Sequence, residues 1–381
     1  MLWLTKIMLK NRIENMWLSA KFGFVGMMEF KILGDICNIV SGGTPPRSKS
    51  QYWDNGNIPW IKIRDIKSKY IEDSEESITI EGLNNSSTKL LTKGTVLYTI
   101  FATLGEVGIL KIDACTNQAI AGLTVKDETK ILPEYLYYYL KSKKNIVNKL
   151  GRGAAQNNIN LSMLKSFEIE IIDIIKQNNI IRTLNYVDNL IKLKSRELEL
   201  LDELVKARFV ELFGDPIIND KGLITELLAN ISNLKAGKAI KIGELSENND
   251  INSLFPCFGG NGIRGYINRY THDGTFPIIG RQGALSGNVN FASGKFYATE
   301  HAIVVTPKVE LDNTWFFYCL KYLDLKRFQT GAAQPGVSVE KLNNISIPLP
   351  NYKSQLYFSN FVKEVDKSRF IIKSMIKEGL L

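Results

Sequence analysis

Apolar residues recur along two segments of the chain at alternating steps of four and three, the heptad spacing of helices that pair as coiled coils. The first segment predicts a helix over residues 176–213, ~57 Å long at 1.5 Å per residue, and Gly214-Asp215-Pro216 follows it as an ending signal. The second segment covers residues 351–381. We expect the two helices to pair in antiparallel fashion within the chain, through Leu184, Val187, Ile191, Leu198, Val362, Val365 and Ile372.

The residues before each predicted helix follow a different pattern. Residues 28–175 and 214–350 contain short apolar runs, such as residues 94–100, separated by Gly, Asn, Asp and Pro. This pattern is typical of short strands joined by turns. Each block also holds one predicted helix, which Pro133 opens in the first block and Asp312 caps in the second. Each block is therefore predicted to be a mixed α/β domain.

The chain repeats itself. Gly153-Ala154-Ala155-Gln156 recurs 178 residues later as Gly331-Ala332-Ala333-Gln334. Further matches at or near this separation are Tyr135 with Trp315, Tyr138 with Tyr318, Leu164 with Leu342, Gln177 with Gln355, Val187 with Val365 and Asp188 with Asp366. So many matches in one order indicate a duplication. We predict an α+β protein in which two α/β domains of one fold, related by an approximate two-fold axis, are joined by long antiparallel helices.

Composition excludes several classes of protein. With 23% charged and 44% apolar residues among 381, the chain has the balance of an ordinary globular protein, and no apolar run reaches the 18 or more residues of a membrane span. Four scattered cysteines without a CxxC pair favour free thiols in the cytoplasm. Two histidines nearly exclude a mechanism that needs a histidine cluster.

The net charge of +9 is unevenly distributed. Six of the nine excess positive charges lie in residues 1–27 and 351–381, so the large blocks are almost neutral. One strip is an exception, because no acid occurs between Glu134 and Glu168, whereas this interval holds Lys141, Lys143, Lys144, Lys149, Arg152 and Lys165. Such a strip can neutralise phosphates. A solvated helix face remains the alternative explanation.

Several signatures of catalysis do not occur in the sequence. It contains no GxxxxGK phosphate loop, no GxSxG elbow and no HExxH zinc pair. The Pro-Pro-aromatic motif of amino-methyltransferases is missing as well, and Thr44-Pro45-Pro46-Arg47 is the nearest approach to it. We therefore predict a binding protein without catalytic or metal-binding residues. The alternatives are a nuclease or methyltransferase that acts alone, and a scaffold that binds proteins rather than DNA.

An ordered set of motifs resembles one known family. Ser41-Gly-Gly-Thr-Pro-Pro-Arg47, followed by Tyr52-Trp53 and Ile58-Pro-Trp-Ile-Lys-Ile-Arg-Asp65, is similar to the opening of a target recognition domain in specificity subunits of Type I restriction-modification systems. Later landmarks of that domain resemble Gly105-Glu-Val-Gly108, Thr116-Asn-Gln-Ala119, Gly153-Ala-Ala-Gln-Asn-Asn-Ile159, Gly280-Arg-Gln-Gly283 and Gly331-Ala-Ala-Gln334. Residues 1–27 lie outside the resemblance as an N-terminal extension, and Met28 is a candidate for the native start.

The resemblance implies a function in the cytoplasm. Each α/β domain would read one half of a bipartite target in double-stranded DNA, and the helices would act as a spacer that docks two methyltransferase subunits. Restriction subunits with motor activity would join that complex. S-adenosylmethionine, ATP and Mg²⁺ would be bound by these partners, and no cofactor is expected in this chain.

Candidate DNA-binding residues follow from side-chain chemistry, because Lys and Arg suit phosphates while Arg, Asn and Gln read base edges. Those selected in the first block are Arg47, Lys49, Arg64, Lys144, Arg152, Gln156 and Asn157. Those in the second are Lys238, Lys241, Arg264, Arg281, Gln282 and Arg327. Gln156 belongs to a motif that both copies share, which favours a loop-holding role. Side chains that differ between the copies are better candidates for specificity.

Overall fold

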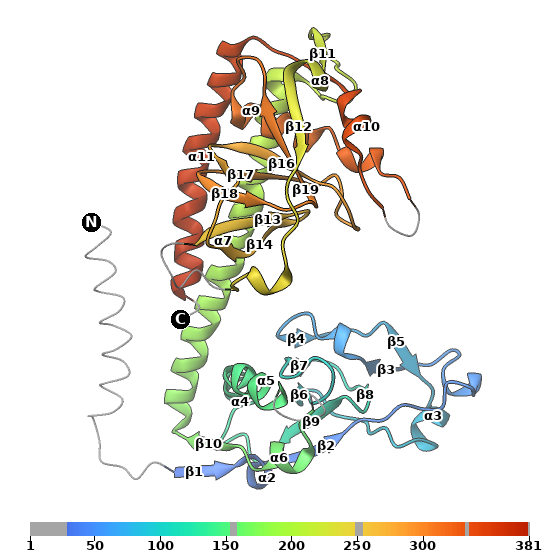
Figure 1. The fold of residues 1–381 in the computed structure, drawn as a ribbon. Helices are drawn as coiled ribbons and strands as arrows, with labels where there is room; N and C mark the ends of the chain where they lie inside the picture. The colour runs from blue at the N-terminus through green and yellow to red at the C-terminus, as the bar shows by residue number, and fades with distance from the viewer. Residues whose placement is uncertain (1–28, 153–157, 248–253, 332–334, 380–381) are drawn as a thin grey trace. The chain divides into compact units, whose positions relative to one another are not determined.

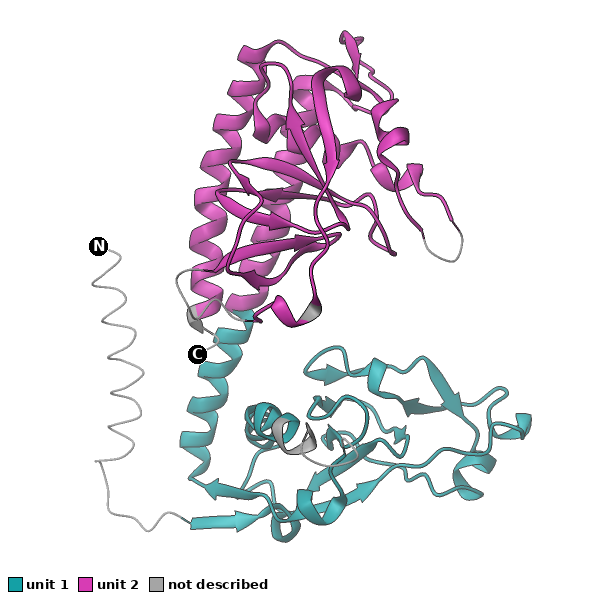
Figure 2. Cartoon of the chain, viewed as in Figure 1, with its two compact units in different colours: residues 1–189 teal, residues 190–381 magenta. Residues whose placement is uncertain are grey.

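A computed structural model describes residues 29–152, 158–247, 254–331 and 335–379. The chain divides into two compact units, unit 1 with residues 1–189 and unit 2 with residues 190–381 (Figure 2). A single helix, α7 (Ile174–Phe213), runs from one unit into the other (Figure 1).

Unit 1 consists of short strands and mostly short helices. Its strands are β1 (Glu29–Ile32), β2 (Cys37–Ser41), β3 (Ile58–Ile61), β4 (Tyr70–Ile71), β5 (Glu76–Ile78), β6 (Val96–Thr99), β7 (Val107–Leu110), β8 (Cys115–Thr116), β9 (Ile120–Val125) and β10 (Glu168–Ile171). Its helices before α7 are α2 (Leu33–Ile36), α3 (Ile80–Asn84), α4 (Pro133–Ser142), α5 (Lys144–Arg152) and α6 (Leu161–Lys165). The strands form sheets of order β2-β9-β6-β7-β4, β5-β3-β8 and β1-β10.

The main sheet of unit 1 is buried on both faces. In β6, Val96 and Tyr98 belong to the core that contains Leu136 of α4, whereas Leu97 belongs to a second core with Ile61 of β3. Successive side chains of a strand point to opposite faces. The four consecutive buried residues of β6 therefore reflect a sheet that is covered on both sides.

A buried glutamine joins the start of α7 to the start of α4. Gln177 accepts a hydrogen bond at its Oε1 from the Leu132 amide at 2.9 Å, just before Pro133 opens α4. Its Nε2 donates to the carbonyls of Lys130 at 2.7 Å and Ile172 at 2.8 Å. Because buried polar groups need partners, this side chain defines where both helices begin.

Unit 2 repeats most of this order. Its strands are β11 (Thr225–Leu227), β12 (Ser232–Ala236), β13 (Phe255–Gly259), β14 (Gly262–Ile267), β15 (His272–Asp273), β16 (Phe276–Gly280), β17 (Val289–Ala292), β18 (Lys295–Ala298), β19 (Ala302–Pro307) and β20 (Ser346–Pro348). Its helices after α7 are α8 (Leu228–Ile231), α9 (Asn313–Tyr322), α10 (Val339–Asn343) and α11 (Tyr352–Gly379). The sheet orders are β12-β19-β16-β17, β14-β13-β18-β15 and β11-β20.

The predicted duplication and the α+β class are confirmed. Strands β2, β9, β6 and β7 of unit 1 are joined in the same order as β12, β19, β16 and β17 of unit 2. The buried Gln355 at the start of α11 accepts from the Asp312 amide at 2.9 Å, as Gln177 does from that of Leu132. Its Nε2 donates to the carbonyl of Pro350 at 2.9 Å. The side-chain amide of the repeated glutamine thus makes equivalent hydrogen bonds in both copies.

Helix α11 packs antiparallel against the C-terminal part of α7 within unit 2. The ring of Phe358, early in α11, lies 5.4 Å from that of Phe209, late in α7. Further along α11, Arg369 donates to Asp202, which lies earlier in α7. Of the residues predicted to pair the helices, Val362 and Val365 are buried in this core, Ile372 is also buried, and Ile191 and Leu198 are half-buried.

The role predicted for Leu184 is corrected by its surroundings. Leu184 lies in the part of α7 that belongs to unit 1, where it packs against the core of that unit, beside the buried Ile181. Val187, three residues on, is half-buried. The apolar repeat along α7 therefore contacts two different domain cores in succession, and a heptad count alone does not distinguish such a helix from a continuous coiled coil.

None of the helices in the described ranges is long and apolar enough to cross a lipid bilayer.

Candidate nucleic-acid interface

Four basic side chains gather beside β3 and β5 in unit 1. We call them the β3–β5 basic cluster, which comprises Arg47, Lys62, Arg64 and Lys67. Glu76 accepts hydrogen bonds from Arg47 and Lys62. Glu75 lies 2.6 Å from Arg64 Nε and 3.6 Å from Lys67 Nζ. The cations outnumber the carboxylates, and the side chains of Arg64 and Lys67 are 62% and 73% exposed. This surface can therefore attract phosphate.

Two tryptophans hold Arg47 in place. Its guanidinium carbon lies 3.5 Å from the centre of the Trp53 ring, and Trp53 meets Trp60 edge to face at 5.0 Å. Trp60 is itself fixed, because its Nε1 donates to the Gly43 carbonyl at 3.0 Å. A guanidinium over an aromatic face is stabilised electrostatically. Arg47 and Arg64 were selected from the sequence and do lie in one cluster, but Lys62 and Lys67 were missed.

Within this cluster, the basic side chains stabilise the ionised form of Glu76. Partial burial alone would raise the pKa of Glu76, but hydrogen bonds from Lys62 and Arg47 outweigh it and hold the pKa below its ordinary value of 4.5. Glu76 therefore stays ionised and orders the basic side chains around it.

The other residues predicted in unit 1 lie apart from these ion pairs. Lys49 donates to the Tyr52 hydroxyl at 3.0 Å. Lys144, at the start of α5, pairs with Glu106 at 2.6 Å, so that its charge is largely neutralised. Arg152 is the last residue of α5. Gln156 and Asn157 lie outside the described residues.

A loop after β6 brings an aromatic side chain to the surface of unit 1. The Ile159 amide donates to the Ile100 carbonyl at 3.0 Å, which anchors the beginning of the loop. Phe101 follows and is 40% exposed. Ala102 adopts a left-handed conformation with φ of 59°, which is costly for a residue with a Cβ. The loop therefore presents Phe101 on a tightly held turn.

The corresponding loop after β16 carries polar side chains in unit 2. The Val337 amide donates to the Arg281 carbonyl at 2.9 Å, and Val337 is the partner of Ile159 in the repeat. Gln282 follows, and Gly283 has the left-handed conformation with φ of 90°. Arg281 and Gln282 are both exposed.

These two loops follow one backbone pattern but differ in chemistry. Phe101 bridges to Asn158 as Gln282 bridges to Gly336, and a left-handed residue comes next in each loop. Arg and Gln read base edges through hydrogen bonds, whereas Phe offers an apolar contact of the kind a thymine methyl makes. Phe101 was missed from the sequence. No sequence signal marked it, because its place opposite Gln282 comes from the loop conformation.

Two neighbours of Arg281 carry buried polar atoms without a hydrogen-bond partner in the described part of the chain. These atoms are Glu300 Oε2 and His301 Nδ1. Arg281 lies beside them, because its amide donates to the His301 carbonyl at 2.8 Å and its Nη1 lies 3.5 Å from the Glu300 carbonyl. Buried polar atoms are rarely left unpaired.

The remaining residues predicted in unit 2 make local contacts. Arg264 is exposed on β14, and its side chain covers the backbone of Gly259. The amides of Lys238 and Lys241 donate to Ala298 at 2.9 Å and to Glu244 at 3.3 Å. Arg327 lies 4.8 Å from the ring of Phe328. Within the described ranges, no group of three or more His, Cys, Asp or Glu residues could hold a metal ion.

Comparison with known proteins decides the family. The family described as the Type I restriction modification DNA specificity domain matches residues 26–203 and again residues 227–380. This chain belongs to that family. As a specificity subunit of a Type I restriction-modification system, it is 29% identical over 354 residues to the EcoprrI specificity subunit of Escherichia coli, with 89% of this chain and 88% of the relative covered. It is 25% identical over 426 residues to the MjaIX specificity subunit of Methanocaldococcus jannaschii, with coverage of 98% and 96%.

Solved structures of specificity subunits share the fold. The crystal structure of an S subunit from M. genitalium has a TM-score of 0.54 at 18% identity and covers 94% of this chain and 95% of its own. A structure described for complex assembly and conformational transition of the type I restriction-modification system has a TM-score of 0.59 at 16% identity, with coverage of 93% and 95%. The two matched ranges of this specificity subunit correspond to the two copies of the repeat.

Proposed function

We propose that this specificity subunit reads a bipartite target in double-stranded DNA, with one half read by each unit. The observation that carries the proposal is the pair of equivalent loops, in which Ile100 and Phe101 stand in unit 1 where Arg281 and Gln282 stand in unit 2. Two readers of one fold with different exposed side chains recognise two different sequences. The β3–β5 basic cluster would position unit 1 on the phosphate backbone.

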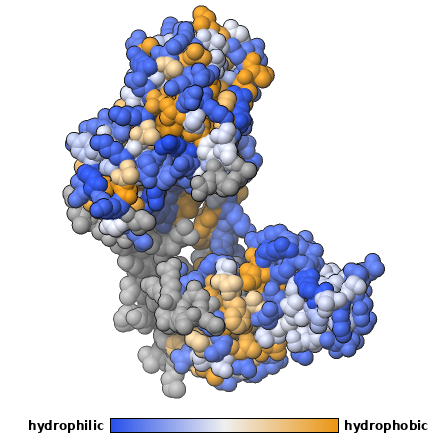
Figure 3. All heavy atoms as spheres, turned by 45° about the vertical axis from the view of Figure 1, so that its right-hand side comes forward, coloured by the Kyte–Doolittle hydropathy of each residue, from blue (hydrophilic) through white to orange (hydrophobic). Residues whose placement is uncertain are grey.

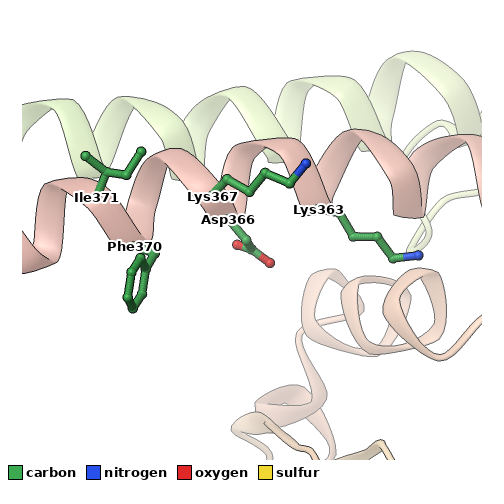
Figure 4. Close-up of a pocket in the computed structure, with 5 residues that line it drawn as sticks. All are labelled: Lys363, Asp366, Lys367, Phe370 and Ile371. Atoms are coloured by element: carbon green, nitrogen blue, oxygen red, sulfur yellow. The ribbon is translucent and has the colours of Figure 1, made fainter. Parts of the chain in front are cut away.

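Helices would dock the methyltransferase subunits of the complex. On α11, a shallow hollow is lined by Lys363, Asp366, Lys367, Phe370 and Ile371 (Figure 4). The Phe370 side chain projects from the helix and is 74% exposed, and apolar patches also interrupt the hydrophilic surface of the units in Figure 3. An exposed apolar stripe with charged neighbours supports a protein interface. Restriction subunits would join through the methyltransferase.

Catalysis would be the task of those partners. S-adenosylmethionine, ATP and Mg²⁺ would bind to the methyltransferase and restriction subunits, and this chain would supply DNA recognition without a catalytic residue of its own. Binding of the duplex would weaken as the salt concentration rises, because neutralised phosphates release counterions.

The proposal is tested by mapping methylated adenines in DNA treated with this subunit and the methyltransferase of its own system. We expect Arg281→Ala to relax one half of the target and Phe101→Ala to relax the other, each by about 1–3 kcal/mol of discrimination. Lys192→Ala, at an exposed position of α7, serves as the control with an unchanged target. Relaxation of the same half by both variants would contradict the assignment of one half to each unit.

A further inference from the structure

A turn formed by Glu300 and His301 lies between β18 and β19, beside the loop that carries Arg281 and Gln282. The His301 carbonyl accepts from the Arg281 amide at 2.8 Å, and Nη1 of Arg281 lies 3.5 Å from the Glu300 carbonyl. The side chains of Glu300 and His301 are each 38% exposed. The turn therefore continues the exposed surface that Arg281 and Gln282 form.

Unit 1 contains a corresponding turn. Gln118 and Ala119 form it between β8 and β9, and the Ala119 carbonyl accepts from the Ile100 amide at 2.8 Å. Ile100 occupies the place of Arg281 in the repeated loop, as described above. The first residue of the turn is thus Gln118 in unit 1 and Glu300 in unit 2.

Close backbone contacts fix both turns in the same way. The Gly42 amide donates to the Ile120 carbonyl at 3.1 Å. In unit 2, the Gly237 amide donates to the Ala302 carbonyl at 3.0 Å. A Cβ atom at Gly42 would lie 2.1 Å from the carbonyl oxygen that ends β8, and one at Gly237 would lie 2.1 Å from the carbonyl oxygen that ends β18. The two turns therefore share one backbone arrangement, which requires glycine beside it.

The side chains at the first position of the turns are held differently. In unit 1, the Thr44 hydroxyl donates to Gln118 Oε1 at 2.5 Å. Ala239 occupies the place of Thr44 in unit 2, two residues after the glycine, and has no hydroxyl. Glu300 Oε1 lies 3.2 Å from Nε2 of His301, its neighbour in the turn. In the described part of the chain, the loop after β2 thus holds Gln118, whereas the loop after β12 does not hold Glu300.

A carboxylate beside a loop that reads DNA has few possible partners on the duplex. It accepts hydrogen bonds but donates none, and phosphates repel it. The major groove offers it the amino groups of the bases, of which cytosine N4 is the usual partner of Glu. Arg281, directly beside Glu300, suits the O6 and N7 atoms of guanine. The two side chains therefore suit different bases that lie close together.

We infer that Glu300 is a further specificity-determining residue, which selects a cytosine in the half-target of unit 2 by accepting a hydrogen bond from its N4 amino group. This inference rests on the proposed function, in which unit 2 reads DNA through Arg281 and Gln282. Because the backbone of the turn is already fixed, little ordering would be needed when Glu300 meets the base. At the equivalent position of unit 1, the amide of Gln118 is tied to Thr44.

The test is Glu300→Gln, which replaces the carboxylate by an amide of the same shape. The full subunit, together with the methyltransferase of its own system, methylates a DNA library randomised in both half-targets. We expect the preference at one base of one half-target to shift from cytosine towards adenine by about tenfold, because Gln pairs with adenine N6 and N7. Glu310→Gln, at an exposed position beyond the other end of β19, is the matched control with the wild-type preference.

The outcomes separate this inference from the proposed function. An unchanged preference for the other half-target in Glu300→Gln reports that the subunit is folded and assembled. Relaxation confined to the base that Arg281→Ala also relaxes would make Glu300 a support for Arg281 and overturn the inference. An unchanged target in Glu300→Gln, with one half relaxed in Arg281→Ala, would overturn the inference and leave the proposed function intact. Unchanged targets in both variants would contradict the proposed function as well.

Discussion

Units 1 and 2 differ most where their side chains are exposed. In the interior, Gln177 and Gln355 make equivalent hydrogen bonds at the starts of two long helices. At the surface, equivalent loops carry Phe101 in one unit and Arg281 with Gln282 in the other. A buried polar group has few alternative partners, whereas an exposed loop residue makes few contacts within the fold. The two copies of the repeat therefore share their buried hydrogen bonds and differ in the exposed side chains of their loops.

The second difference lies in the small sheets. In unit 1, β3 pairs with β5 and with β8, and β5 contributes the Glu76 that orders the basic cluster. In unit 2, β13 pairs with the longer β14 and with β18. Arg264 on β14 makes no comparable set of ion pairs among the described residues. Charge that is gathered into one cluster in unit 1 is thus dispersed in unit 2.

The largest effect is expected in the core that α7 and α11 share in unit 2. Phe358→Ala removes a fully buried ring and should lower the free energy of unfolding of this unit by about 3–5 kcal/mol. Phe370→Ala, on the same helix but 74% exposed, should change it by less than about 0.5 kcal/mol. Chemical denaturation, with hydrogen exchange read separately in each unit, measures the change in stability of both variants. Equal losses would contradict the packing described for α11.

The matched glutamines allow a direct comparison of the two frames. Gln177→Leu leaves the Leu132 amide and the carbonyls of Lys130 and Ile172 without their partner, and should destabilise unit 1 by about 2–4 kcal/mol. Gln355→Leu should destabilise unit 2 by a similar amount. Protease sensitivity of each unit distinguishes the two results. Greater protease sensitivity of unit 2 in Gln177→Leu, or of unit 1 in Gln355→Leu, would contradict the equivalence of the two glutamines.

A smaller effect is expected for phosphate contacts. Arg64→Ala in the β3–β5 basic cluster should weaken duplex binding for all sequences alike and reduce the slope of log K against log salt by about one. Lys192→Ala, on an exposed part of α7, is the control and should keep the wild-type slope of log K against log salt. A sequence-dependent loss in Arg64→Ala would instead make this arginine a base reader.

The smallest effect concerns pH. The lowered pKa of Glu76 means that its ion pairs stabilise unit 1 above the ordinary value of 4.5, and that this contribution is lost as pH falls through the lowered pKa. The free energy of unfolding of wild type should exceed that of Glu76→Gln by at most about 1 kcal/mol near neutral pH, because solvent screens the pair, and by less near pH 3. Urea denaturation at both pH values tests the sign. A difference that grew on acidification would contradict it.

Much of the fold could be predicted from the sequence, but less of the site. The duplication, the mixed domains and the antiparallel helices follow from residue spacing, because period and order are properties of the chain itself. Arg47 and Arg64 could be named from charge, but Lys62 and Glu76 join them only through the pairing of β3 with β5. Phe101 has no charge to identify it, and only its loop conformation shows that it occupies the position of Gln282.

The sequence by itself determined that one unit occurs twice and that long helices accompany each copy, since hydrophobic periodicity and repeated motifs are local quantities. Only the tertiary structure decided which core each turn of α7 serves. Leu184 packs in unit 1 and Phe209 in unit 2, although both obey one apolar repeat. The physical reason is that periodicity specifies which face of a helix is apolar, whereas the domain that buries this face is chosen by the complete packing of the chain.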